Sequence, residues 1–109
     1  MGTVTNITQA KFFVGELVHH RLFDYRGVIV DVDQHFQATD EWYEAVAKSR
    51  PTKNKPWYHV LVHGGDHSTY VAEQNLESDD ILEPINHPMV KHYFTEFNDG
   101  RYVRVDRDN

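Results

Sequence analysis

The chain has 109 residues, a formal net charge of −6 and no cysteine. This suits one domain with a modest core and excludes disulfides, thiolate metal sites and cysteine nucleophiles. No apolar run approaches the roughly 20 residues of a membrane-spanning helix, and the N-terminus lacks a signal-peptide pattern, so we expect a cytoplasmic protein. The negative charge has the wrong sign for phosphate contacts, so nucleic-acid binding would need a local basic patch.

The first predicted strand follows a polar segment. Residues 1–10 are polar and unpatterned, and we expect a flexible N-terminal arm. Residues 16–20 should then form a short strand, with Val14 and Val18 pointing inward. We expect a barrel domain over residues 11–83.

The second predicted strand covers residues 26–33 and is rich in β-branched side chains. Alternation places three valines on one apolar face: Val28, Val30 and Val32. Asp31 and Asp33 fall on the other face, which should therefore contact water, with Ile29 as an exception. Gly27 within this pattern indicates a bulge or a sharp bend.

A short helix is predicted at residues 40–48. Thr39 is a good N-cap, acidic residues follow it near the positive end of the helix dipole, and Trp42 and Val46 recur at helical spacing. A basic, irregular connector broken by two prolines comes next. Its four cations are Lys48, Arg50, Lys53 and Lys55.

Three further strands are expected. Residues 57–63 are apolar on both faces, so this strand should be central or covered. A glycine-containing turn leads to a fourth strand at residues 68–74, and residues 79–83 should pair briefly as a fifth. The predicted fold is mainly β, a small, partly open barrel of about five strands with one short inserted helix.

The C-terminal tail, residues 84–109, carries structure of its own. Pro88 can begin a short helical turn, and the sequence Asn-Asp-Gly at residues 98–100 is typical of a hairpin turn. Three aromatic residues of the tail are candidates for an interface: Phe94, Phe97 and Tyr102. They would dock either on the chain's own barrel or on a neighbouring subunit. We expect a homo-oligomer, because a barrel of this size leaves sheet edges to cover.

Several blocks of this sequence occur together, in this order, in one known family. The blocks are Phe12, Gly15, Val18, His20, residues 21–33 (RLFDYRGVIVDVD), 41–45 (EWYEA), 57–62 (WYHVLV) and 70–76 (YVAEQNL). Together they resemble the HspQ heat shock protein family, also described as hemimethylated-DNA-binding or YccV-like. His87-Pro88 and residues 99–102 (DGRY) look like the tail of some members, so the resemblance covers roughly residues 11–103.

The resemblance implies a small SH3-like barrel and a role in the heat-shock response. It also implies binding of hemimethylated DNA near the replication origin, lowered levels of the replication initiator protein, and enhanced degradation of proteins by the Lon protease.

Enzymatic and metal chemistry have weak candidates. His63, Asp66 and His67 surround a turn and could approach one ion, although polar turns are usually just solvated. Asp31 and Asp33 would lie about 6.6 Å apart on one strand face, which a glycosidase pair allows but which barrel exteriors show routinely. The serines lack a nucleophile elbow and no glycine loop cradles phosphate. We therefore expect no enzyme, no metal and no cofactor.

The basic connector is the best nucleic-acid candidate, because cations beside aromatic residues can hold phosphate while a base stacks. Arg21 and Arg26 flank the first hairpin and would extend this surface. The alternative is a solvated loop whose lysines serve solubility. The function we favour is a stress-associated adaptor or specificity factor for Lon-type proteolysis, including turnover of the replication initiator. The alternative function is recognition of hemimethylated DNA near the replication origin.

Overall fold

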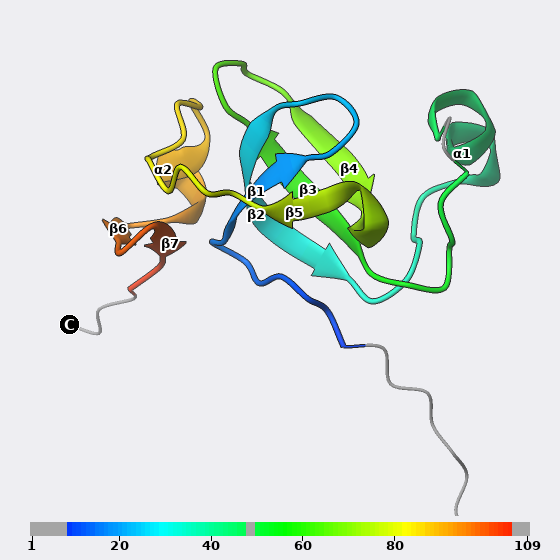
Figure 1. Cartoon of the computed structure of the whole chain (residues 1–109), viewed down its shortest axis with the longest axis horizontal. Coiled ribbons are helices and arrows are strands. Elements are labelled where there is room, and N and C mark those ends of the chain that lie inside the picture. The colour runs from blue at the N-terminus through cyan, green and yellow to red at the C-terminus, as the bar shows by residue number, and fades with distance from the viewer. Residues whose placement is uncertain (1–8, 48–49, 106–109) are drawn as a thin grey trace, which may run out of the picture.

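An antiparallel five-stranded sheet lies at the centre of the structure (Figure 1). The computed structural model describes residues 9–47 and 50–105. The strand order is β4-β3-β2-β1-β5. The strands are β1 (Leu17–His20), β2 (Arg26–Asp33), β3 (Trp57–Val62), β4 (Ser68–Ala72) and β5 (Leu76–Ser78). The sheet does not close, so β4 and β5 are its edges, and the predicted mainly β, partly open fold is confirmed.

Short helices and a second, two-stranded sheet flank the central sheet. Helix α1 (Asp40–Val46) lies between β2 and β3, as predicted, and the 3₁₀ helix η1 (Glu73–Asn75) joins β4 to β5. The tail forms α2 (Val90–Tyr93) and the strands β6 (Glu96–Asn98) and β7 (Arg101–Val103), at the opposite end of the view from α1 (Figure 1). In the part of the chain that the structure describes, no helix has the length and apolar character needed to cross a membrane.

Two local signals in the sequence are confirmed. The Thr39 hydroxyl accepts a hydrogen bond from the Trp42 N–H at 3.1 Å and caps α1. Asp99 and Gly100 both have positive φ, at +52° and +79°, and form the turn between β6 and β7. Each signal depends only on residues close together in the chain.

The predicted valine face of β2 is wrong, because the strand contains a bulge after Ile29. Ile29 lies opposite Val60, but the next paired residue, Asp31, lies opposite His59, so Val30 is an extra residue. The bulge reverses the alternation. Val28 and Val30 therefore contact the cluster that faces the tail, whereas Ile29 and Val32 contact the cluster inside the barrel.

Gly27 has a different role from the one predicted. The bulge lies three residues further on, and Gly27 instead allows β3 to approach closely. A Cβ atom on Gly27 would lie 2.4 Å from Val60 Cγ1 and 2.5 Å from the Leu61 carbonyl oxygen. A side chain at this position would therefore separate the two central strands.

The ends of the sheet also differ from the prediction. Val14 is exposed rather than inward, whereas Val18 is fully buried. The fifth strand is β5, not residues 79–83, because η1 ends β4 early and brings Leu76 opposite His20 of β1. Asp79 follows β5 and turns inward to an arginine, as described below.

A buried carboxylate fastens the segment before β1 to the barrel. The Tyr58 hydroxyl donates to Glu73 Oε2 at 2.7 Å, and the Lys11 N–H donates to the same oxygen at 3.0 Å. The Phe12 N–H in turn donates to the Tyr58 hydroxyl oxygen at 3.3 Å. Burial, together with the neighbouring Glu73, raises the pKa of Tyr58 well above its usual range. The hydroxyl therefore stays protonated and donating at neutral pH.

Replacing Tyr58 by phenylalanine should lower the free energy of unfolding by about 1.5–3 kcal/mol, because a buried hydrogen bond to a charged group is lost. Urea denaturation at neutral pH measures the loss. Tyr25→Phe is the matched control, since it removes a neutral bond to Thr69 Oγ1 and should lose only about 0.5–1.5 kcal/mol. Equal losses in the two variants would contradict a charged acceptor at Tyr58.

Candidate functional site

The aromatic residues of the tail pack on their own chain. Phe94 and Tyr102 are buried and their rings stack with centroids 5.3 Å apart. They join the buried cluster with Leu17, Val28, Leu61 and Ile85. Phe97 packs at the edge of this cluster and is half-buried. Of the two alternatives for the tail, the structure therefore shows docking on the chain's own barrel.

Arg26 belongs to a buried ion pair and not to a basic surface. Its Nε and one terminal nitrogen lie 3.0 and 2.9 Å from Asp79 Oδ2, and the same terminal nitrogen donates to the Glu83 carbonyl at 2.6 Å. Burial alone would raise the pKa of Asp79, but hydrogen bonds from Arg26 and from two backbone N–H groups outweigh burial and lower this pKa. Arg26 thus holds the end of β5 and is removed from the candidate DNA contacts.

The described cations of the basic connector are largely matched by acidic residues of α1. Arg50 forms an ion pair with Glu44. Lys53 lies 3.0 Å from Asp40 and 4.3 Å from the centre of the Tyr43 ring. Arg50 and Lys53 therefore lie against the helix with acidic partners.

Two of the predicted cations that the structure describes lie outside these pairs. Lys55 and Arg21 are exposed, and Lys48 lies outside the described residues. Arg21 comes from the loop between β1 and β2, whereas Lys55 comes from the segment before β3, so the two belong to different parts of the fold.

An apolar groove of about 660 Å³ lies between α1 and the loop that joins β1 to β2. We call it the aromatic groove. Its walls include Trp42 and Val46 of α1, Trp57 of β3, Tyr70 of β4, and Leu22 and Phe23 of the loop. Among the described residues that line it, none is Lys, Arg, Asp or Glu. The volume lies within the range of binding sites for small molecules and peptide side chains.

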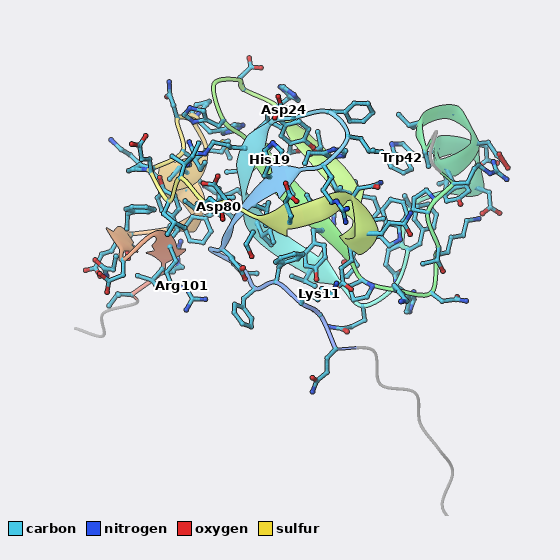
Figure 2. All side chains as sticks on the ribbon, in the orientation of Figure 1. Lys11, His19, Asp24, Trp42, Asp80 and Arg101 are labelled. Atoms are coloured by element: carbon cyan, nitrogen blue, oxygen red, sulfur yellow. The ribbon has the colours of Figure 1, made fainter. Side chains whose placement is uncertain are left out.

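Packed rings form the α1 wall of the aromatic groove. Trp57 contacts Tyr70 with centroids 5.1 Å apart, and Trp42 lies 6.0 Å from Trp57 and 5.7 Å from Tyr70. Figure 2 shows Trp42 on the side of α1 that faces the sheet. The Trp57 indole N–H donates to the Thr52 carbonyl at 3.1 Å, which anchors the ring from behind. These contacts fix the wall in place without a bound partner.

A histidine organises the opposite wall. The N–H groups of Leu22 and Phe23 donate to His20 Nδ1 at 3.1 and 3.0 Å, and the Phe23 ring stacks on the imidazole at 4.7 Å. Burial, reinforced by the charge of neighbouring His19, lowers the pKa of His20. The imidazole is therefore neutral at pH 7 and can accept both bonds, while the side chains of Leu22 and Phe23 stay exposed.

This arrangement predicts that His20 makes stability depend on pH. Because its pKa is lower in the folded chain, the unfolded chain binds the extra proton, and the contribution of His20 is lost as the pH falls below about 6.5. Asn at position 20 offers an acceptor that does not titrate in this range. Urea denaturation from pH 5 to pH 8 should therefore show a smaller loss at low pH for His20→Asn than for the wild type.

His19 supplies a control of opposite sign. Its ring nitrogens lie 2.6 Å from Asp24 and 2.8 Å from Glu77, and these contacts raise the pKa of His19. His19 and Asp24 are labelled in Figure 2. Its contribution is present below the usual histidine pKa and is lost as the pH rises. His19→Gln should therefore steepen the acid loss that His20→Asn reduces, and the same change of slope in both variants would contradict the assignment.

The bulge in β2 brings a histidine to the two aspartates expected to face water. Ligand atoms of Asp31, Asp33 and His59 lie within 4.8 Å of one another, and they form the one such group found in residues 9–47 and 50–105. Asp33 is already used, since it accepts a hydrogen bond from the Tyr70 hydroxyl at 2.6 Å and lies 3.3 Å from His59 Nε2. At the other candidate metal site, the turn with His63, Asp66 and His67, His63 has a structural role: its Nδ1 accepts a hydrogen bond from the Asn86 N–H at 2.8 Å.

Sequence reasoning missed the aromatic groove. Trp42 and Tyr70 each fit the pattern of a helix or strand face, and no local signal shows that these faces meet. The exposed Leu22 and Phe23 were the available clue, since two adjacent large apolar residues in a loop of a small protein often mark a contact surface.

The sequence matches one protein family over most of its length. A profile of the family described as "Hemimethylated DNA-binding protein YccV like" matches residues 10–101. The match spans the five-stranded sheet, α1 and most of the docked tail. The resemblance seen in the sequence blocks is thereby confirmed, and the chain belongs to the YccV-like family of hemimethylated-DNA-binding proteins.

Proposed function

We propose that this protein is a non-enzymatic, stress-associated adaptor that presents client proteins, including the replication initiator, to a Lon-type ATP-dependent protease in the cytoplasm. The observation that carries this proposal is the aromatic groove, whose described lining has no Lys, Arg, Asp or Glu and whose rim exposes Leu22, Phe23 and Val46. Such a surface suits an apolar polypeptide segment, because burying a charge without a partner is costly. The net charge of −6 is compatible with a protein partner.

A degradation assay tests the adaptor role. Purified Lon and an unfolded test substrate are incubated with and without this protein, and faster substrate loss is expected in its presence. Val46→Glu should remove the acceleration, whereas Val14→Glu should retain it. These positions are equally exposed, at 51% and 49%, but only Val46 lines the aromatic groove. An unchanged rate, or digestion of this protein alone, would contradict the proposal.

Recognition of hemimethylated DNA is the second candidate, and the family match favours it. The exposed Arg21 and Lys55 would supply phosphate contacts, together with Lys48. Each phosphate neutralised should contribute a slope of about −0.9 to the dependence of log affinity on log salt.

Titration of a labelled hemimethylated duplex and its fully methylated twin, each at two salt concentrations, tests this second role. Tighter binding of the hemimethylated duplex is expected, with a shallow salt dependence because three of the described candidate cations, Arg26, Arg50 and Lys53, are already paired with carboxylates. Equal and weak binding of both duplexes would exclude recognition of the methylation state.

A further inference from the structure

β4 is an open edge of the sheet. Its neighbour in the sheet is β3, and the ladder between them is bracketed by two hydrogen bonds, from Val62 N–H to the His67 carbonyl and from Glu73 N–H to the Pro56 carbonyl. In an antiparallel pair, alternate residues bond to the neighbour. Since Val60 lies opposite Thr69 within this ladder, the main-chain groups of Thr69 and Val71 point to β3.

The intervening residues point the other way. The main-chain N–H groups of Ser68, Tyr70 and Ala72 face away from β3, as do the carbonyls of Ser68 and Tyr70. The Ala72 carbonyl is used at the start of η1, of which Ala72 is the N-cap. Apart from this start of η1, no other segment within residues 9–47 and 50–105 makes a main-chain hydrogen bond to this side of β4. An unpaired row of this kind is a template for another strand.

The aromatic groove surrounds this free edge. All five residues of β4 line the groove, although successive side chains of a strand point to opposite faces of the sheet. A cavity that contacts both faces of one strand must extend around its edge. On one side of the edge, Trp42 packs against Tyr70. On the other side, Tyr25 bonds to Thr69 and contacts His20, on which Phe23 stacks.

We propose that this groove binds an extended, uncharged and apolar segment of a client protein as an additional strand on β4. This inference rests on the adaptor function proposed above and specifies how a client is recognised. The free main-chain groups bind the client backbone, and alternate client side chains pack against α1 and against the loop between β1 and β2. Five residues of strand span about 16 Å, so a client segment of about five residues fills the edge.

This mode of binding selects unfolded proteins. In folded domains, apolar segments are buried and their backbone N–H and C=O groups are hydrogen-bonded. Unfolding exposes both the apolar side chains and the backbone groups. Backbone recognition tolerates many client sequences, whereas the uncharged walls reject segments carrying Lys, Arg, Asp or Glu. The groove therefore selects clients by their unfolded state and not by one particular sequence.

Hydrogen exchange on the full chain tests the strand addition directly. The probe is a capped seven-residue peptide of alternating valine and serine. On binding, the amide protons of Ser68, Tyr70 and Ala72 should become protected, whereas those of Thr69 and Val71, already bonded to β3, should change little. A peptide N-methylated on alternate residues in the register facing β4 should not bind, but one methylated in the other register should bind. Binding without protection of the three edge amides would overturn the proposal.

Single substitutions test the contributions of the β4 edge and of the groove walls to peptide binding separately. Ser68→Pro removes one outward N–H at the first residue of β4, where proline is tolerated. Leu22→Glu places a charge in one wall. Each should weaken peptide binding roughly tenfold, the loss expected for one unmade bond or one buried charge. Ile81→Glu is the control, because Ile81 is exposed to 57%, like Leu22 at 58%, but does not line the groove. Circular dichroism confirms that each variant is folded.

Two outcomes distinguish this inference from the adaptor function. If Lon degradation is accelerated but the peptide does not protect the edge, strand addition is wrong and the adaptor role stands. If the peptide protects the edge but Lon is unaffected, the adaptor role is wrong and strand addition stands. A dimer that dissociates in Ser68→Pro, seen by gel filtration, would assign the edge to a second copy of this chain and overturn the inference.

Discussion

Replacing Asp79 with alanine is expected to lower the free energy of unfolding by about 3–5 kcal/mol, the usual consequence of removing one partner of a buried ion pair. The side chains of Asp79 and Arg26 are only 3% and 13% exposed. Without the carboxylate, the Glu83 carbonyl is the one acceptor that the described part of the chain leaves to the guanidinium. The Leu82 N–H, which donates to Asp79 Oδ2 at 3.1 Å, also loses its acceptor.

Urea denaturation at pH 7 measures this loss, and an exposed ion pair provides the control. Asp40→Ala breaks the contact with Lys53, in which Asp40 is 86% exposed, and should change stability by no more than about 1 kcal/mol. The double variant Arg26→Met/Asp79→Leu should recover part of the stability lost by Asp79→Ala, because it leaves no buried charge unpaired, while the Leu82 N–H still lacks its acceptor. Similar losses for the Asp79 and Asp40 variants would contradict a buried pair.

The same ion pair should appear in the acid denaturation of the wild type. Because the pKa of Asp79 is lower in the folded chain, its contribution is present above the usual aspartate pKa. It is lost as the pH falls from about 4 through the folded pKa. Asp79→Ala should therefore show a smaller loss of stability below pH 4 than the wild type, measured from the same neutral starting point.

Gly15→Ala is also expected to have a large effect. It should lower the free energy of unfolding by about 2–4 kcal/mol, because it strains the backbone and breaks a hydrogen bond. Gly15 has φ +95°, and a Cβ atom there would lie 2.0 Å from the Tyr102 carbonyl oxygen. The Tyr102 N–H donates to the Gly15 carbonyl at 2.8 Å. An added methyl group must therefore push β7 away from the barrel.

Limited proteolysis and thermal melting measure the consequence, which should include release of the tail with Phe94 and Tyr102. Gly64→Ala is the matched control. Gly64 also has a positive φ, +82°, but a Cβ there would meet open space. It therefore carries the backbone strain without the steric clash. Equal sensitivity of the two variants to protease would show that the tail does not depend on this close approach.

The two proposed functions place different demands on the surface. A protein client needs exposed apolar groups, which the aromatic groove supplies in one place. DNA needs cations without acidic neighbours, and the structure pairs Arg26, Arg50 and Lys53 with carboxylates. The family match keeps DNA recognition as a candidate. The geometry of the described residues favours the adaptor.

The sequence by itself determined those features whose causes lie within a few residues. Thr39 predicts the start of α1 because its hydroxyl reaches an N–H three residues away, and the turn at residues 98–100 needs only residues that tolerate positive φ. The apolar character of residues 57–63 on both faces predicted a central or covered strand, and β3 lies inside the sheet between β2 and β4. The family was also readable, since it depends on the order of residues along the chain.

Only the tertiary structure decided the register, the partners and the groove. The bulge at Val30 follows from packing on both faces of β2, which a simple alternation cannot express. Arg26 and Asp79 are 53 positions apart, and nothing local distinguishes a buried ion pair from two solvated charges. The free edge of β4 exists because the sheet does not close. These features depend on which distant segments meet, and that is set by burial of the whole chain and not by the preference of any one stretch.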